Sequence, residues 1–191
     1  GERPPKEPLY SAYDVRKCLY RSVLAGGAGF AYGCEPIRQL YRKGDQVHVY
    51  WHYDMPEWTE GLKAPGSSQL HWLPDWLQVR SYFTRVPAQE LLLKRERFIG
   101  VAVDRSVPDN EHPAAHIRVA RCSEGRYILA YLPVKQLLEL DVSGLEGDSF
   151  RVTELNPETG ETLNTWVSTE KERFTFIPRR DLDTFVVLDV E

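Results

Sequence analysis

Four of the five tryptophans of this sequence lie between residues 51 and 76: Trp51, Trp58, Trp72 and Trp76. Flat aromatic faces can stack on ligand rings, including those of sugars, but tryptophan also buries much apolar surface in cores. Trp76 has helical spacing with the apolar residues that follow it, so we expect it in the core, and we expect Trp72 to pack as well. Trp51 and Trp58 fit a core role and a ligand contact equally.

The histidines and cysteines lack the spacing of a metal centre or a nucleophilic site. On an extended strand His48 and His52 would stand about 13 Å apart, too far to share an ion. Structural zinc sites use paired spacings such as C-x-x-C, whereas Cys18, Cys34 and Cys122 are widely separated. We predict no metal site and read the cysteines as buried free thiols.

The elements that would position these residues change character along the chain. Helical signals dominate the first half: Asp14 is a candidate N-cap and Gly26 and Gly27 a stop signal for one helix, and residues 74–85 are predicted to form a second. After about residue 97, eight short apolar segments alternate with turn residues. This spacing predicts an antiparallel β-sandwich or barrel. We therefore expect an α+β chain with domains at 1–95 and 96–191.

A glycine-rich segment follows the first helix. Residues 25–33 read AGGAGFAYG, which suits an apolar strand buried on both faces. Helix, glycine-rich strand and loop together make one unit of an α/β barrel, whose chemistry lies where strands end. That place corresponds here to residues 32–37. A phosphate-binding loop is rejected because its helix follows the glycines.

Composition narrows the classes of partner. The chain has a formal net charge of −4 and a pI of about 5.8, with no basic stripe for nucleic acid. The apolar runs are far shorter than a membrane span. We expect neither nucleic acid nor membrane as a partner.

The segment YDVRKCLYRSVLAGGAGFAYGCEPIRQLY at residues 13–41 resembles the late-barrel part of the apiosidase-like glycoside hydrolases. That family is expected to show R-x-x-x-Y-W-S-x-x-A-G-x-x-G-H-T-Y-G followed by W-Q. Downstream, Trp58, Leu62 and PGSSQL at residues 65–70 resemble the family as well. The pattern is met by Arg16, Tyr20, Ser22, Ala25, Gly26, Gly29, Tyr32, Gly33 and Gln39.

The C-terminal half is similar to the domain, labelled collagen-binding, that accompanies these barrels. RYILAYLP, ELNPETGE and FIPRRDLDTFVVLDVE resemble its strands and turns. The likeness thus extends over nearly the whole chain. It implies a late segment of a (β/α)₈ barrel followed by a β-sandwich, no organic cofactor, and a secreted or periplasmic bacterial protein.

The resemblance also assigns candidate site residues. Glycoside hydrolysis usually takes two carboxylates, and Glu2 matches the family's late-barrel nucleophile, although a frayed terminus is the plainer interpretation. Tyr32 and Gln39 fit the family pattern and are candidates for contact with the sugar. Glu35, in the loop after the glycine-rich strand, fits a sugar contact or a solvated loop acid, and Trp51 and Trp58 are candidates as members of the tryptophan cluster. The second carboxylate has no candidate. Four positions depart from the pattern: Arg21, Phe30, Ala31 and Arg38.

Two hypotheses follow. In the first, the chain is part of a glycoside hydrolase acting on complex, plant-type polysaccharide, and is inactive unless a partner chain or a further barrel portion completes it. In the second, it is a non-catalytic module that binds carbohydrate or protein. Exposed aromatics along a sheet face would favour the second, and a bare apolar edge beside the helices would favour the first.

Overall fold

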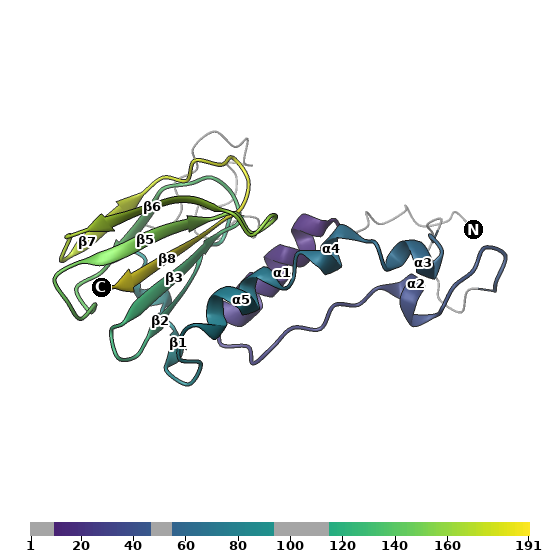
Figure 1. The fold of residues 1–191 in the computed structure, drawn as a ribbon, viewed down its shortest axis with the longest axis horizontal. Coiled ribbons are helices and arrows are strands. Elements are labelled where there is room, and N and C mark those ends of the chain that lie inside the picture. Colours follow the sequence, from purple (N-terminus) through teal and green to yellow (C-terminus); the bar gives the residue numbers. More distant parts are fainter. Residues whose placement is uncertain (1–9, 47–54, 94–114) are drawn as a thin grey trace, which may run out of the picture.

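The computed structural model describes residues 10–46, 55–93 and 115–191. Two antiparallel sheets and a layer of helices form the fold (Figure 1). The larger sheet has the order β1-β2-β3-β8-β5-β6, and the smaller one pairs β4 with β7. The strands are β1 (Arg85–Pro87), β2 (Arg118–Cys122), β3 (Tyr127–Leu132), β4 (Leu138–Asp141), β5 (Phe150–Leu155), β6 (Thr162–Ser168), β7 (Arg173–Phe176) and β8 (Thr184–Val190).

Seven of the eight strand segments expected in the second half of the chain are confirmed as β2 to β8. The eighth, residues 98–104, lies outside the described residues. The turn residues between the segments explain the success, because they mark where one strand ends and the next begins. Strands of the large sheet can be apolar throughout, because their side chains point to two buried faces. Ile128 faces the core between the two sheets, whereas its neighbour Leu129 faces the helices.

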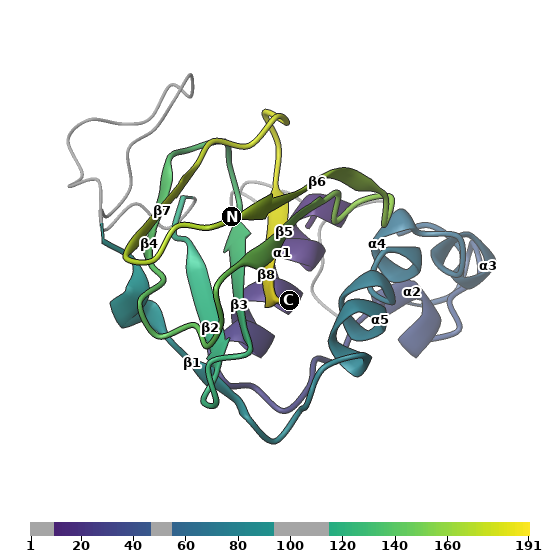
Figure 2. The same ribbon diagram turned by 60° about the vertical axis from the view of Figure 1, so that its left-hand side comes forward.

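The helical layer covers the face of the large sheet that points away from β4 and β7 (Figure 2). Two helices do this: α1 (Ala12–Leu24) and α5 (Trp72–Gln78). From α1, Tyr20 is fully buried and stacks on Tyr131 of β3 with ring centroids 4.6 Å apart. The ring of Trp76, half-buried on α5, stacks on Phe185 at 5.5 Å. The fold is therefore α+β, with one sheet buried on both faces.

Capping residues fix the ends of α1. Ser11 is the N-cap, and Asp14 occupies the third helical position of a capping box, so the expectation of Asp14 as the cap was wrong by one turn. At the other end Gly26 adopts φ +98°, and the Gly27 N–H bonds the Ser22 carbonyl at 2.9 Å. The two glycines stop the helix as predicted, in a Schellman-type turn.

The glycine-rich segment at residues 25–33 does not form the expected strand. A barrel strand needs a neighbour on each side to bond its N–H and C=O groups. No strand of the described residues pairs with this segment. It runs instead as an irregular connection from α1 to the next helix.

The helix expected at residues 74–85 is shorter than predicted. It ends at Gln78, and Val79 and Phe83 are 78% and 95% exposed instead of facing the core. The Arg80 guanidinium donates to the Trp76 carbonyl and to Asp189 of β8. This contact satisfies a carbonyl at the helix end, which sequence periodicity does not reveal.

The large sheet begins before residues 94–97, where we expected the domain boundary. β1 pairs with β2. Ala88, just before the short 3₁₀ helix η1 (Gln89–Leu91), and Leu91, its last residue, lie in the core between the sheets.

None of the described helices is long and apolar enough to cross a membrane.

Candidate functional site

The described candidate residues for sugar contact lie on or next to two of three short helices, which are α2 (Glu35–Arg38), α3 (Trp58–Gly61) and α4 (Pro65–Ser68). Glu35 lies in α2 and Trp58 in α3, with Tyr32 just before α2 and Gln39 just after it. Helices α2 and α3 lie at the end of the molecule away from the sandwich (Figures 1 and 2). Glu2, the candidate nucleophile, and Trp51 lie outside the described residues. We call residues 32–41 and 57–70 the α2–α4 segment.

Glu35 is held by its own helix. Arg38 donates to its two carboxylate oxygens at 2.8 and 2.6 Å, and the Gln39 amide donates to one of them. These hydrogen bonds lower the pKa of Glu35, so the side chain is an anion at neutral pH and unsuited to the role of general acid. Glu35 and Gln39 thus lie together, and the hydrogen bond between them uses part of the hydrogen-bonding capacity of each side chain.

Glycines let the short helices approach one another closely. A methyl group on Gly61 would lie 3.1 Å from Ile37 and 3.2 Å from the Cys34 sulfur, which joins α3 to α2. A methyl group on Gly66 would lie 3.5 Å from the Tyr32 hydroxyl, so α4 packs against the irregular connection that precedes α2. Burial first, and the neighbouring Cys34 second, raise the pKa of Tyr32.

Trp58 starts α3 and is half-buried. Its backbone N–H bonds the Tyr41 carbonyl at 2.9 Å. The contact of Gly61 with α2 places this helix beside the helix that carries Glu35. The structure therefore gathers four of the six predicted residues, Tyr32, Glu35, Gln39 and Trp58, in one segment.

A buried network joins α1 to the sandwich. Arg16 is 2% exposed and Asp183, just before β8, is fully buried. The guanidinium donates to Asp183 through Nε at 3.1 Å and Nη2 at 2.9 Å, and Nη1 donates to the Gln69 side chain. Burial alone would lower the pKa of Arg16, but the bonds and charge of Asp183 outweigh it and raise that pKa.

The sequence pattern marked Arg16 and the PGSSQL motif but assigned them no role. One signal was present: Arg16 lies on the same helical face as Leu19, Tyr20 and Val23, at spacings of three, four and seven. A charged residue on a buried face requires a buried partner. The partner's identity was not readable, because Asp183 lies 167 residues away.

Two further contacts fix the helical layer to the sheets. Arg80, after α5, makes a bidentate ion pair with Asp189 near the end of β8. At the other end of α5, a methyl group on Gly160 would lie 2.4 Å from the Trp72 ring, so the β5–β6 hairpin lies directly on that ring. The packing roles expected of Trp72 and Trp76 are confirmed.

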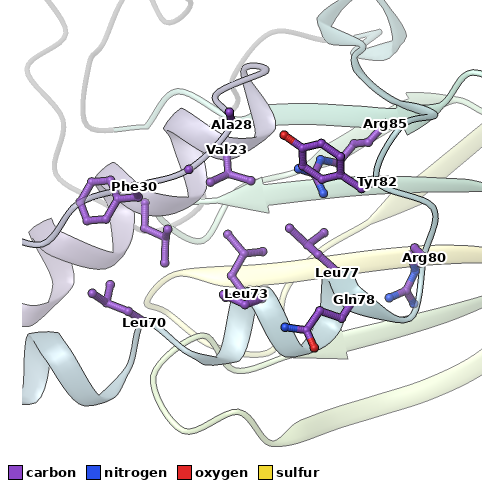
Figure 3. A pocket seen from close by; sticks show the side chains of 13 residues that line it. Val23, Ala28, Phe30, Leu70, Leu73, Leu77, Gln78, Arg80, Tyr82 and Arg85 are labelled. Carbon is purple, nitrogen blue, oxygen red and sulfur yellow. The ribbon is translucent and has the colours of Figure 1, made fainter.

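An apolar groove of about 510 Å³ opens between α1, the connection at residues 28–30 and α5 (Figure 3). Val23, Phe30, Leu70, Leu73 and Leu77 line it, while Arg80, Tyr82 and Arg85 close one end. Phe30 is 37% exposed. The groove is therefore apolar along most of its wall, with polar side chains at the end that Arg80, Tyr82 and Arg85 close.

The described residues include possible metal ligands and all three cysteines. Within them, no group of three or more His, Cys, Asp or Glu side chains could hold an ion. All three cysteines are free, but only Cys122 is buried. The prediction of buried thiols was therefore wrong for Cys18, which is exposed on α1, and for Cys34, which is half-buried.

The first half of the chain matches a known family of enzymes. Residues 2–84 match the sequence model described as "Apiosidase-like, catalytic domain". No curated protein sequence matches the chain.

Two solved structures share the fold of nearly the entire chain. One is titled "Glycoside hydrolase", with a TM-score of 0.77 and 21% identity over 97% of this chain. The other is a glycoside hydrolase family 5 protein from Bacteroides vulgatus, with a TM-score of 0.76 and 22% identity over 98% of this chain. The chain spans only 38% of the length of each. Residues 2–84 are therefore similar to an apiosidase-like catalytic domain, and the chain shares the fold of part of two glycoside hydrolase structures.

Proposed function

We propose that this chain is the C-terminal portion of a glycoside hydrolase that acts on complex, plant-type polysaccharide, with the β-sandwich as an accessory domain of the collagen-binding-labelled type. The observation that carries the proposal is the match of residues 2–84 to an apiosidase-like catalytic domain. Helix α1 and the connection after it would be a late unit of a (β/α)₈ barrel.

The apolar groove supports completion of that barrel. Phe30 and Leu70 stand at an open groove of about 510 Å³ whose other walls are α1 and α5. Apolar patches of this kind mark interaction surfaces in soluble proteins. The remaining barrel strands, on the same polypeptide or on a partner chain, would cover the groove and give residues 25–33 the neighbours a strand needs.

The proposed chemistry needs two carboxylates across the scissile bond. Glu2 is the candidate nucleophile by resemblance, and Tyr32, Gln39 and Trp58 would line the sugar subsite. Glu35 would orient Arg38 and Gln39 instead of transferring a proton, since its oxygens already accept from both. Without the further barrel portion the chain would be inactive.

The alternative is a non-catalytic module that binds carbohydrate or protein. It is favoured by the exposed Leu40 and Leu62, 63% and 57% accessible, in the segment that carries Trp58. Against a sheet-based binding face, every aromatic side chain on the described strands is buried or half-buried. We therefore rank the enzyme portion first.

Native mass spectrometry of the protein from its producing cells tests the proposal, with subunit masses read after denaturation. We expect a barrel portion on the same polypeptide or in a tightly bound larger subunit, together with release of reducing sugar from pectin or xylan that Glu2→Gln abolishes. Glu172→Gln, at an exposed carboxylate of the sandwich, is the control and retains activity. A lone 22.1 kDa chain without hydrolysis would overturn the proposal and favour the binding module.

A further inference from the structure

We propose that Asp183 of the sandwich is a positioning residue for the α2–α4 segment, acting through Arg16 and Gln69. The inference rests on the proposed function only in giving that segment a sugar to contact. In this proposal the sandwich sets the position of the α2–α4 segment in the N-terminal half of the chain.

The linkage is buried along its length. Asp183 is fully buried, Arg16 is 2% exposed and Gln69 is 9% exposed. Nε and Nη2 of one guanidinium bond Asp183 while Nη1 bonds the Gln69 oxygen. Because the guanidinium is a rigid planar fork, the bidentate pair with Asp183 dictates where Nη1 points.

Asp183 is itself oriented from the sheet. The Tyr131 hydroxyl on β3 donates to its Oδ2 at 3.1 Å. The Tyr131 ring is fixed in turn by stacking on Tyr20 of α1. The carboxylate therefore has one orientation in the fold, and the guanidinium follows it.

The far end of the linkage reaches the candidate site. Gln69 is the C-cap residue of α4, and its backbone N–H bonds the Pro65 carbonyl at 3.3 Å. Within α4, Gly66 lies against Val15 of α1 and the Tyr32 ring. A shift of Gln69 therefore moves α4 against Tyr32.

The second Arg–Asp pair shows what simple anchoring would look like. Arg80 pairs with Asp189 and with the Trp76 carbonyl of its own helix. None of these three hydrogen bonds reaches α2, α3 or α4. Asp189, near the far end of β8 and with the same kind of partner, is therefore the control for Asp183.

Amide hydrogen exchange on the full chain tests the proposal without any sugar, comparing Asp183→Asn with Asp189→Asn. In Asp183→Asn we expect the backbone amides of residues 66–70 to exchange about tenfold faster, the loss typical of one charge-assisted hydrogen bond, while Asp189→Asn leaves them unchanged. Wild-type exchange there in Asp183→Asn, or equal acceleration in both variants, would overturn the proposal.

A second variant covers the case in which Asp183→Asn does not fold. Gln69→Met breaks only the last link and leaves the buried ion pair intact. The same acceleration confined to residues 66–70 would support the linkage, and wild-type exchange would refute it. Since no substrate enters either measurement, failure to find glycosidase activity would sink the proposed function and leave this result standing.

Discussion

The two ends of the helical layer are held to the rest of the molecule in different ways. Helices α1 and α5 share a buried core with the large sheet and are clamped to both ends of β8 by the pairs Arg16–Asp183 and Arg80–Asp189. The α2–α4 segment contributes no residue to either core cluster of the described chain, except that Leu70 packs at the edge of one.

This difference divides the residues that carry the family resemblance. Arg16 and Tyr20 are buried between α1 and the sandwich, whereas Tyr32 and Trp58 are half-buried in the α2–α4 segment. Substitutions should therefore affect stability in the first group and binding in the second.

The largest expected effect is on Arg16. Arg16→Ala leaves Asp183 as a buried, uncompensated charge and should lower the free energy of unfolding by about 3–5 kcal/mol. Arg80→Ala is the control: Asp189 is one-third exposed, so that loss should be about 1 kcal/mol. Urea denaturation measures both. Equal losses would show that the buried pair holds the layer no better than the exposed one.

The next effect is at the contact of the β5–β6 hairpin with α5. Gly160 has φ +77°, and an added methyl group would lie 2.4 Å from the Trp72 ring, so Gly160→Ala should cost about 2–4 kcal/mol for strain and overpacking together. The control is Gly44, which has φ +98° and open space around it. Gly44→Ala should therefore lower the free energy of unfolding by only about 1 kcal/mol. If thermal melts shift equally, the hairpin does not press on Trp72.

A smaller effect concerns alkaline pH. Burial, and then the charge of Asp183, raise the pKa of Tyr13 to about 12. Because the folded pKa is the higher one, this residue's contribution is fully present below pH 10 and is lost as pH rises from about 10 to 12. With solvent screening we expect a loss of about 1 kcal/mol from this residue.

Tyr13→Phe separates the contribution of Tyr13 ionisation from that of the other groups that titrate at alkaline pH. The variant should lose about 1 kcal/mol at pH 7 with the hydrogen bond to the Pro133 carbonyl, and its stability should fall less steeply above pH 10. Chemical denaturation at several pH values gives the slopes. An unchanged alkaline slope would contradict the assignment to Tyr13.

The smallest effect is expected at Glu35. Its hydrogen bonds come from neighbours on α2, which lies outside both core clusters, so Glu35→Gln should leave Tm unchanged at pH 7. The lowered pKa of Glu35 means that any contribution is lost only as pH falls through that depressed value. A melt as low as that of Gly160→Ala would show that α2 supports the whole fold.

Local patterns in the sequence determined much of this protein. Turn residues between short apolar segments predicted β2 to β8, because such residues favour the tight connections between neighbouring strands. Gly26 and Gly27 predicted the end of α1, because a helix stop with positive φ is a local requirement. The candidate residues Tyr32, Gln39 and Trp58 were likewise predicted from the sequence as motif positions.

The tertiary structure alone decided the rest. Whether residues 25–33 form a strand depends on pairing partners, which local sequence does not specify. Likewise, α5 ends at Gln78 where Arg80 meets Asp189, and Arg16 pairs with a carboxylate 167 residues away. The physical reason is the same in each case: hydrogen bonds and ion pairs between distant segments exist only once the chain has brought their partners together.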